Sequence, residues 1–332
     1  PGMSFFAVGS CFARNVEEQL EQAGARVTSR TIAVRDLGDS SARQGGMFNK
    51  YTPVSILQEL RWAAGLDTYP PEALLPLGNG EFYDPYLSGK AGRGSQAELL
   101  ARREEVRRYF AQIFEADVAI ITLGLIESWT DLTTGLALNE TPDPKFLARN
   151  AERFGFEQLS LEQCEAALDQ IMDILRRFSK PGQRKILTVS PVALGRTFTD
   201  DDVILANMTS KSTLRIAATR LIARCDDVDY FASYEAVMLS DPALSWQRDR
   251  RHVSDVVVGQ IIRTFLQRYG ISNERPEELE AARAALRQDK TFQTWAERAG
   301  SDEELLARLN REVNKYKNMV IKLQKELRLA QR

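Results

Sequence analysis

The stretch SFFAVGSCFARNVEEQL, residues 4–20, decides the fold because it carries the first strand, a glycine turn and the first helix. Its apolar run ends at Gly9, and apolar residues then recur at the spacing of an amphipathic helix. Ser10 and Cys11 therefore stand at a strand-to-helix turn, where helix amides stabilise an anion. We expect a thiol at this place to ionise more readily than a free one, so Cys11 is a candidate nucleophile. The structural alternative makes Ser10 a helix N-cap and Cys11 a small buried residue.

Strand-like and helix-like segments alternate over residues 1–270. Short apolar runs predict strands, and periodic segments with capping residues predict helices. This alternation favours a parallel sheet covered by helices on both faces, so the predicted fold class is α/β. A polar segment between Gly135 and Gly155 is expected to be a long surface excursion beside the sheet. The strands are expected at 4–10, 25–33, 118–124, 185–191 and 228–234, and the helices at 11–24, 52–65, 96–116, 160–178, 209–224 and 253–270.

The charge and the cysteine content exclude several classes of function. The 332 residues carry a formal net charge of −2 with both signs interspersed, so we expect neither a nucleic acid nor an anionic membrane as partner. Cys11, Cys164 and Cys225 have no regular spacing, which argues against a metal site and against a disulfide framework. We therefore expect a reducing, cytoplasmic location. No apolar run approaches the length of a bilayer-spanning helix, so we expect no transmembrane segment.

A change in composition divides the chain. We expect an α/β domain at 1–270, a helical linker at 271–300 and a coiled coil at 301–332. Apolar residues in the last segment recur at alternating steps of three and four, a heptad pattern that predicts a parallel homodimer through residues 306–330. The alternative is a helix that packs on its own domain. The seam consists of Leu306, Leu309, Val313, Tyr316, Val320, Leu323, Leu327 and Ala330.

The chain has a single histidine, His252. It is therefore the one candidate for imidazole acid/base chemistry at neutral pH. Asp249 precedes it by three residues, just before a predicted helix. This spacing can bring a carboxylate to one imidazole nitrogen while the other nitrogen faces a nucleophile. In a charge-rich loop, the same spacing also arises as an accidental surface pair.

Seven segments, in this order, resemble the GSCFA family, a group related to the SGNH/GDSL hydrolases. They read FAVGSCFARN, GGMFNKYTP, ITLGLIESW, LTVSPV, TSKSTLR, YFASYEAV and DRRH, and the resemblance covers about residues 4–268. It implies an SGNH-hydrolase-like fold, in which the sheet is the middle of three flavodoxin-like layers.

The resemblance also implies roles for the turn residues. In SGNH enzymes the first segment reads Gly-Asp-Ser, and the third residue is the nucleophile. Laid on Gly9, Ser10 and Cys11, this pattern implies Cys11 as the nucleophile. Ser10 remains a second candidate, because a one-residue change in the turn would present its hydroxyl instead. His252 would then act as the base and Asp249 as the carboxylate that orients it.

SGNH relatives use the nucleophile's own amide, a glycine and an asparagine as oxyanion donors. The resemblance implies Gly46 and Asn49 as part of this set. Gly124 matches the glycine of a later segment, but no asparagine follows it at the spacing of the relatives. Either Asn49 supplies the side-chain donor or one donor is missing. Glu127 and Trp129 are expected to face the cleft and bind substrate, although a tryptophan buried against the sheet is the commoner arrangement.

Lys211, in the segment TSKSTLR, is expected near the start of a helix. There it would hold an acidic or phosphorylated group of the substrate. The equal alternative is a solvated lysine beside a helix cap formed by Thr209 or Ser210.

The resemblance implies acyl transfer on a carbohydrate. A thioester on Cys11 would pass its acyl group to a sugar hydroxyl in an O-acyltransferase, the function we favour, or to water in a carbohydrate O-acetyl esterase. A transferase needs an acyl donor, and we consider acyl-CoA, although no phosphate-binding glycine loop stands out and no bound cofactor is expected. The alternative from another class is a non-catalytic module that binds a glycan or a partner and dimerises through the coiled coil.

Overall fold

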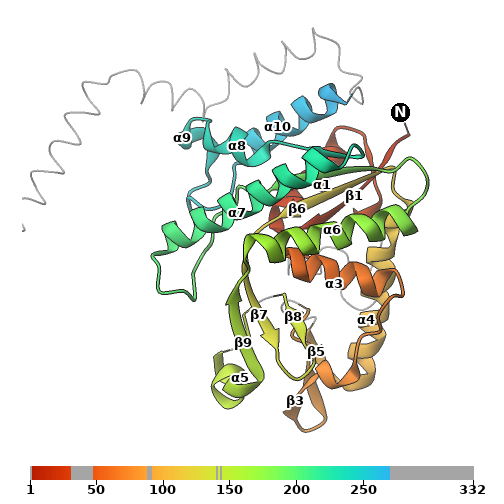
Figure 1. The fold of residues 1–332 in the computed structure, drawn as a ribbon, viewed down its shortest axis with the longest axis vertical. Coiled ribbons are helices and arrows are strands. Elements are labelled where there is room, and N and C mark those ends of the chain that lie inside the picture. Colours follow the sequence, from red (N-terminus) through yellow and green to blue (C-terminus); the bar gives the residue numbers. More distant parts are fainter. Residues whose placement is uncertain (1, 31–47, 88–91, 140, 143, 270–332) are drawn as a thin grey trace, which may run out of the picture. The chain divides into compact units, whose positions relative to one another are not determined.

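The computed structural model describes residues 2–30, 48–87, 92–139, 141–142 and 144–269. Among these residues, a five-stranded parallel sheet has the order β2-β1-β6-β10-β11 (Figure 1). This is the strand order of flavodoxin-like folds, and the order reverses between β1 and β6. The predicted α/β class is confirmed, although the second strand covers only two residues before a 3-10 turn at Thr28–Arg30. The strands are β1 (Ser4–Gly9), β2 (Arg26–Val27), β6 (Val118–Leu123), β10 (Arg184–Val189) and β11 (Val228–Tyr230).

Helices cover both faces of this sheet (Figure 1). In β1, Phe6 and Val8 pack into one layer while Phe5 and Ala7 pack into the other, and all four are fully buried. Because successive side chains alternate between the faces of a strand, a strand covered on both sides is apolar at every position. One layer holds α3 (Pro53–Ala63), α4 (Gln96–Ala111), α6 (Leu161–Phe178) and α7 (Val203–Arg224), and the other holds α1 (Cys11–Gln22), α8 (Ser233–Met238) and α10 (Asp255–Arg268).

The start of α7 differs from the prediction. The helix begins at Val203, where the Asp202 side chain accepts a hydrogen bond from the N–H of Ile204, and not at residue 209. Ile204 and Leu205 in its first turn are exposed. Exposed apolar residues break the amphipathic pattern from which a helix start is predicted. The predicted start at residue 209 is therefore six residues after the observed one at Val203.

Two small antiparallel sheets lie beside the main sheet (Figure 1). The polar segment 135–155 was expected to be a surface excursion beside the main sheet, and it lies there, but it also supplies β8 and the start of β9 in one of these small sheets. Trp62 of α3 joins Leu138 and Phe154 of that sheet in a separate apolar cluster, which gives the segment a core of its own. The sheets consist of β3 (Leu75–Gly78), β4 (Glu81–Tyr83) and β5 (Arg93–Gly94), and of β7 (Glu127–Asp131), β8 (Leu136–Leu138) and β9 (Phe154–Gln158). The remaining short elements are α5 (Pro144–Arg149), α9 (Pro242–Ser245) and 3-10 turns at Pro71–Ala73, Gln112–Glu115 and Ala151–Arg153.

The predicted linker at 271–300 and the coiled coil at 301–332, with its seam at 306–330, lie outside the described residues. The homodimer therefore stays a prediction. In the part of the chain that is described, no helix is long and apolar enough to cross a membrane.

Candidate active site

Gly9 ends β1 at the point where the strand order of the sheet reverses. Its φ angle is +140°, and a Cβ atom there would lie 2.1 Å from the carbonyl oxygen of Thr122 in β6. Only glycine fits this close approach of two strands. The Gly9 carbonyl oxygen accepts a hydrogen bond of 2.8 Å from the N–H of Lys50, which holds residues 49 and 50 beside the turn. Gly9 therefore shapes the turn and anchors the neighbouring segment.

Ser10 is the N-cap of α1. Its backbone is extended, and its Oγ accepts a hydrogen bond of 3.3 Å from the N–H of Phe12. The residue is only 4% exposed. Its hydroxyl is thus engaged at the helix terminus, as the structural alternative for this residue predicted.

Cys11 is the first residue of α1, and it is half-buried with a free thiol. Burial raises the pKa of the Cys11 thiol above its ordinary value. The charges of Arg251 and Lys211 and the N–H groups of Phe12 and Cys11 lower that pKa but do not offset the burial. The expectation that Cys11 ionises more readily than a free thiol is therefore wrong, because the helix N-terminus does not compensate for lost hydration. A nucleophile at this position needs a base.

Asp249 and His252 lie at the tip of a short hairpin closed by a bridge between Trp246 and Val253. Oδ2 of Asp249 lies 2.5 Å from Nδ1 of His252. Oδ1 of Asp249 accepts hydrogen bonds of 3.0 Å from the N–H groups of Arg251 and His252. These three contacts hold the pKa of Asp249 well below its usual range, and the contact with the imidazole has the largest effect. The carboxylate therefore stays charged beside the ring.

Arg251 links this hairpin to the loop after β10 and acts electrostatically on Cys11. Its Nε donates a hydrogen bond of 3.1 Å to the carbonyl oxygen of Ala193, beyond the end of β10. Its charge also lies near enough to Cys11 to lower the pKa of the thiol. In addition, Cys11 packs against the apolar core that contains Val253, the residue after His252. The Asp249–His252 pair and Cys11 are thus at the same edge of the sheet.

Lys211 lies in the interior of α7, not at its start, and it is only 1% exposed. Its Nζ donates hydrogen bonds of 2.8 Å to the carbonyl oxygen of Gly124 and 2.9 Å to that of Val192. Burial lowers the pKa of Lys211 to about 7. The expectation that this lysine holds an acidic group at a helix start is therefore wrong, and so is the solvated alternative beside a cap at Thr209 or Ser210. Lys211 instead ties together the chain segments that follow β6 and β10.

The structure describes two of the three residues predicted as oxyanion donors, Gly124 and Asn49. The N–H of Gly124 donates to the carbonyl oxygen of Tyr51 at 3.2 Å, so this amide is already engaged and the expected donor role of Gly124 is not supported. Asn49 forms a bridge with Gly9 and is almost fully buried beside the turn. Its Nδ2 donates to the hydroxyl of Tyr51 at 3.2 Å, whereas its Oδ1 has no hydrogen-bond partner among the described residues. Gly46 lies outside the described residues.

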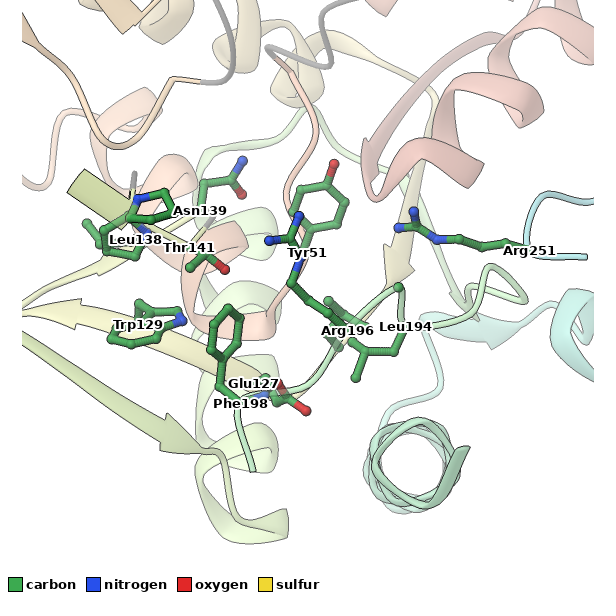
Figure 2. A pocket seen from close by; sticks show the side chains of 14 residues that line it. Tyr51, Glu127, Trp129, Leu138, Asn139, Thr141, Leu194, Arg196, Phe198 and Arg251 are labelled. Atoms are coloured by element: carbon green, nitrogen blue, oxygen red, sulfur yellow. Dashed lines mark hydrogen bonds between the residues drawn. The ribbon is translucent and has the colours of Figure 1, made fainter. Parts of the chain in front are cut away.

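A pocket of about 500 Å³ lies between β7, the loop after β10 and the hairpin arginine Arg251 (Figure 2). Glu127 and Trp129 both line it, as expected from the sequence. The ring of Trp129 meets that of Phe198 edge-on, with centroids 5.3 Å apart. Glu127 accepts hydrogen bonds from the Thr197 hydroxyl at 2.6 Å and from the N–H of Phe198 at 3.2 Å. The pocket thus has an aromatic side that a carboxylate holds in place.

The lining residues that were not identified from the sequence include Tyr51, Asn139, Arg196 and Arg251. Tyr51 and Arg251 stand in the segments GGMFNKYTP and DRRH, next to residues that were identified, and this adjacency is the only signal they carry. Asn139 and Arg196 come from segments without periodicity, so no local pattern marks them. Among the described residues, no cluster of three or more His, Cys, Asp or Glu side chains could hold a metal ion.

The fold and the site together define an α/β protein of flavodoxin-like strand order, with a cysteine at the switch point of the sheet and an Asp–His pair at the same edge. The sequence profile of the GSCFA family matches residues 4–265, so the chain belongs to the GSCFA family. No curated protein matches the sequence. Among solved structures, a Clostridium thermocellum family 3 carbohydrate esterase is similar at 11% identity and a TM-score of 0.33, over 80% of this chain and 94% of that chain. A similarity of this level carries no conclusion about the present chain.

Proposed function

We propose that this protein transfers an acyl group to a carbohydrate hydroxyl, with Cys11 as the nucleophile, His252 as the base and Asp249 as the residue that orients the base. The observation that carries the proposal is the position of the chain's sole imidazole. It is paired with a charged carboxylate on a hairpin whose Arg251 acts electrostatically on the Cys11 thiol. A nucleophile, a base and an orienting group at one edge form the minimal set for acyl transfer.

Cys11 fits the nucleophile better than Ser10 does. The Ser10 hydroxyl is buried and accepts a hydrogen bond from the N–H of Phe12, whereas the Cys11 side chain is half-buried and free. The N–H of Cys11 is one of the first amides of α1, which have no carbonyl partner within the helix. It is therefore a donor for the oxyanion of an acyl intermediate. Asn49, whose backbone forms a bridge with Gly9, is our candidate for the second donor, because its Nδ2 has a second hydrogen besides the one that it donates to Tyr51.

The reaction has two balanced steps. Nδ1–H of His252 donates to Asp249, so Nε2 accepts the proton of the Cys11 thiol. The thiolate then adds to the carbonyl carbon of the donor ester or thioester, and the leaving group departs with the proton from His252. In the second step His252 takes the proton of a sugar hydroxyl, whose oxygen attacks the Cys11 thioester. The Cys11 thiolate leaves and recovers the proton, which regenerates the enzyme.

A carbohydrate O-acyl esterase is the second candidate, in which water replaces the sugar hydroxyl. The exposure of the His252 side chain, 38%, favours this alternative, because water can reach the base. For the transferase, acyl-CoA is the class of donor that would supply the acyl group as a thioester. The two candidates share the first step and differ only in the acceptor.

The test is the release of nitrophenolate from 4-nitrophenyl acetate, with the acetyl adduct on the protein followed by mass spectrometry. We expect Cys11→Ala and His252→Ala to abolish turnover, and Ser10→Ala to retain it. Cys225→Ala is the matched control, since Cys225 is another partly buried free thiol. Equal rates in all variants would overturn the catalytic proposal in favour of a binding module. Loss in Ser10→Ala alone would move the nucleophile to Ser10.

A further inference from the structure

The pocket that Glu127 and Trp129 line also holds two arginines whose side chains have no carboxylate partner among the described residues. Arg196 is exposed and forms no hydrogen bond or ion pair with any described residue. Within the described part of the chain, the guanidinium of Arg251 donates only to the carbonyl oxygen of Ala193. Figure 2 shows both side chains reaching into the pocket from different segments, with Trp129 on the far side from Arg251. Among the described lining residues, the two arginines therefore outnumber the one carboxylate, Glu127.

Buried polar atoms at the pocket also lack partners. Asn139 is only 6% exposed, and its Oδ1 has no hydrogen-bond partner among the described residues. The same holds for Nε1 of Trp129, at the aromatic side of the pocket. A buried donor or acceptor without a partner costs free energy, so a polar ligand in the pocket would gain by pairing with these two atoms. An acceptor, a donor and an aromatic face together suit a hydroxyl-bearing ring.

We propose that this pocket binds an anionic sugar, whose carboxylate or phosphate pairs with Arg196 and Arg251 while its ring lies against Trp129. A volume of about 500 Å³ is in the range of small-molecule sites. The inference rests on the proposed function, since it names the class of acceptor for that reaction. Guanidinium groups form strong charge-assisted hydrogen bonds with such anions.

The position of Arg251 distinguishes a sugar from the phosphates of an acyl-CoA. Arg251 lies near enough to Cys11 for its charge to act on the thiol. In coenzyme A, the long pantetheine arm separates the phosphates from the thioester that Cys11 would attack. An anion held at Arg251 therefore belongs to a compact ligand whose reacting hydroxyl lies close to its charge.

Binding is measured on the full chain carrying Cys11→Ala, so that turnover does not interfere. The probes are methyl β-D-glucuronide, methyl β-D-glucoside, glucose 1-phosphate and coenzyme A, in ligand-observed NMR titrations. We expect the glucuronide or the sugar phosphate to bind at least about tenfold more tightly than the neutral glucoside, the effect of one charge-assisted contact. Arg196→Gln and Arg251→Gln should each lower the ratio of affinities for the charged and the neutral sugar by about tenfold. Arg220→Gln, an exposed arginine paired with Glu165 outside the pocket, is the matched control and should not change it.

Equal binding of the charged and neutral sugars would overturn the inference. So would tight binding of coenzyme A that depends on both arginines while neither sugar binds, because the pocket would then be a donor site. Since the Cys11→Ala chain is inactive in the proposed reaction, these outcomes are independent of the turnover test. If the charged sugar binds but the wild-type chain shows no turnover, only the proposed function is contradicted.

Discussion

Nδ1 of His252 lies 2.5 Å from Oδ2 of Asp249, and the backbone N–H of the same histidine donates to Oδ1 at 3.0 Å. The carboxylate therefore holds both the ring and the main chain of its partner. Arg250, between them, has a φ angle of +55°, a conformation that L-residues adopt at a cost. The turn persists because three hydrogen bonds to one carboxylate stabilise it.

Asp249→Asn should lower the rate of acyl transfer by about a hundredfold or more, because the amide no longer selects the tautomer with a basic Nε2 or stabilises the imidazolium. The rate of nitrophenolate release measures this effect. Asp255→Asn, in the exposed first turn of α10, is the control and should keep its rate. An Asp249→Asn chain with at least half the wild-type rate would show that the pair is only a surface contact.

The reactivity of Cys11 with iodoacetamide should rise steadily with pH and show no plateau below about pH 9, because burial raises the pKa of the thiol. Arg251→Gln should slow the reaction at any fixed pH below that range, because its charge favours the thiolate. Mass spectrometry of the Cys11 peptide measures the rate. Cys164, buried with a pKa raised to about 12, is the internal control and should not react. A plateau near neutral pH would contradict the prediction.

Gly9→Ala should destabilise the fold by at least about 3 kcal/mol, because the new methyl group meets the Thr122 carbonyl in addition to the strained φ angle. Gly135→Ala separates the two causes. Gly135 also has a positive φ angle, +72°, but nothing lies within 4 Å of its Cβ position, so its cost should be about 1 kcal/mol. Urea unfolding midpoints measure both variants. Similar losses for the two would mean that the strands can separate at the turn.

Lys211 should make the stability of the protein depend on pH. Its pKa is about 7 in the folded chain and near 10.5 when exposed, so between these values the unfolded state binds more protons. Folding stability should therefore rise with pH across this window, by an amount on the order of 3 kcal/mol. Lys211→Met has no titrating amine at this position. Its free energy of unfolding should therefore rise less between pH 7 and pH 10 than that of the wild type. Denaturant unfolding at several pH values compares the two chains, and parallel curves would argue against a titrating buried amine.

The predicted coiled coil at 306–330 is tested by sedimentation. We expect the full chain to be a dimer and a chain that ends at Ser301 to be a monomer, because truncation removes the complete apolar seam. An unchanged assembly after truncation would mean that the segment does not mediate dimerisation. The rate of acyl transfer in the truncated chain serves as the check that the α/β domain remains folded.

β1 and β6 were predictable because they are buried on both faces, which makes nearly every position in them apolar. The sheet of β7, β8 and β9 was missed because its strands mix exposed and buried positions and include polar residues such as Glu127 and Asp131. The two turns that carry Cys11 and His252 could be identified from the sequence because of the residue types in them. The raised pKa of Cys11 could not be predicted from the sequence, because it depends on burial and on the charge of Arg251, 240 positions away along the chain.

The sequence by itself determined the α/β alternation, the glycine turn before Cys11 and the presence of a single imidazole with a carboxylate three residues before it. These are local properties, which follow from periodicity and from residue type. Only the tertiary structure decided that Lys211 is buried against two carbonyl groups, that Ser10 caps a helix, and that Arg251 lines the pocket and acts electrostatically on Cys11. Burial and charge at a site arise from segments that meet in space, and no local pattern encodes which segments meet.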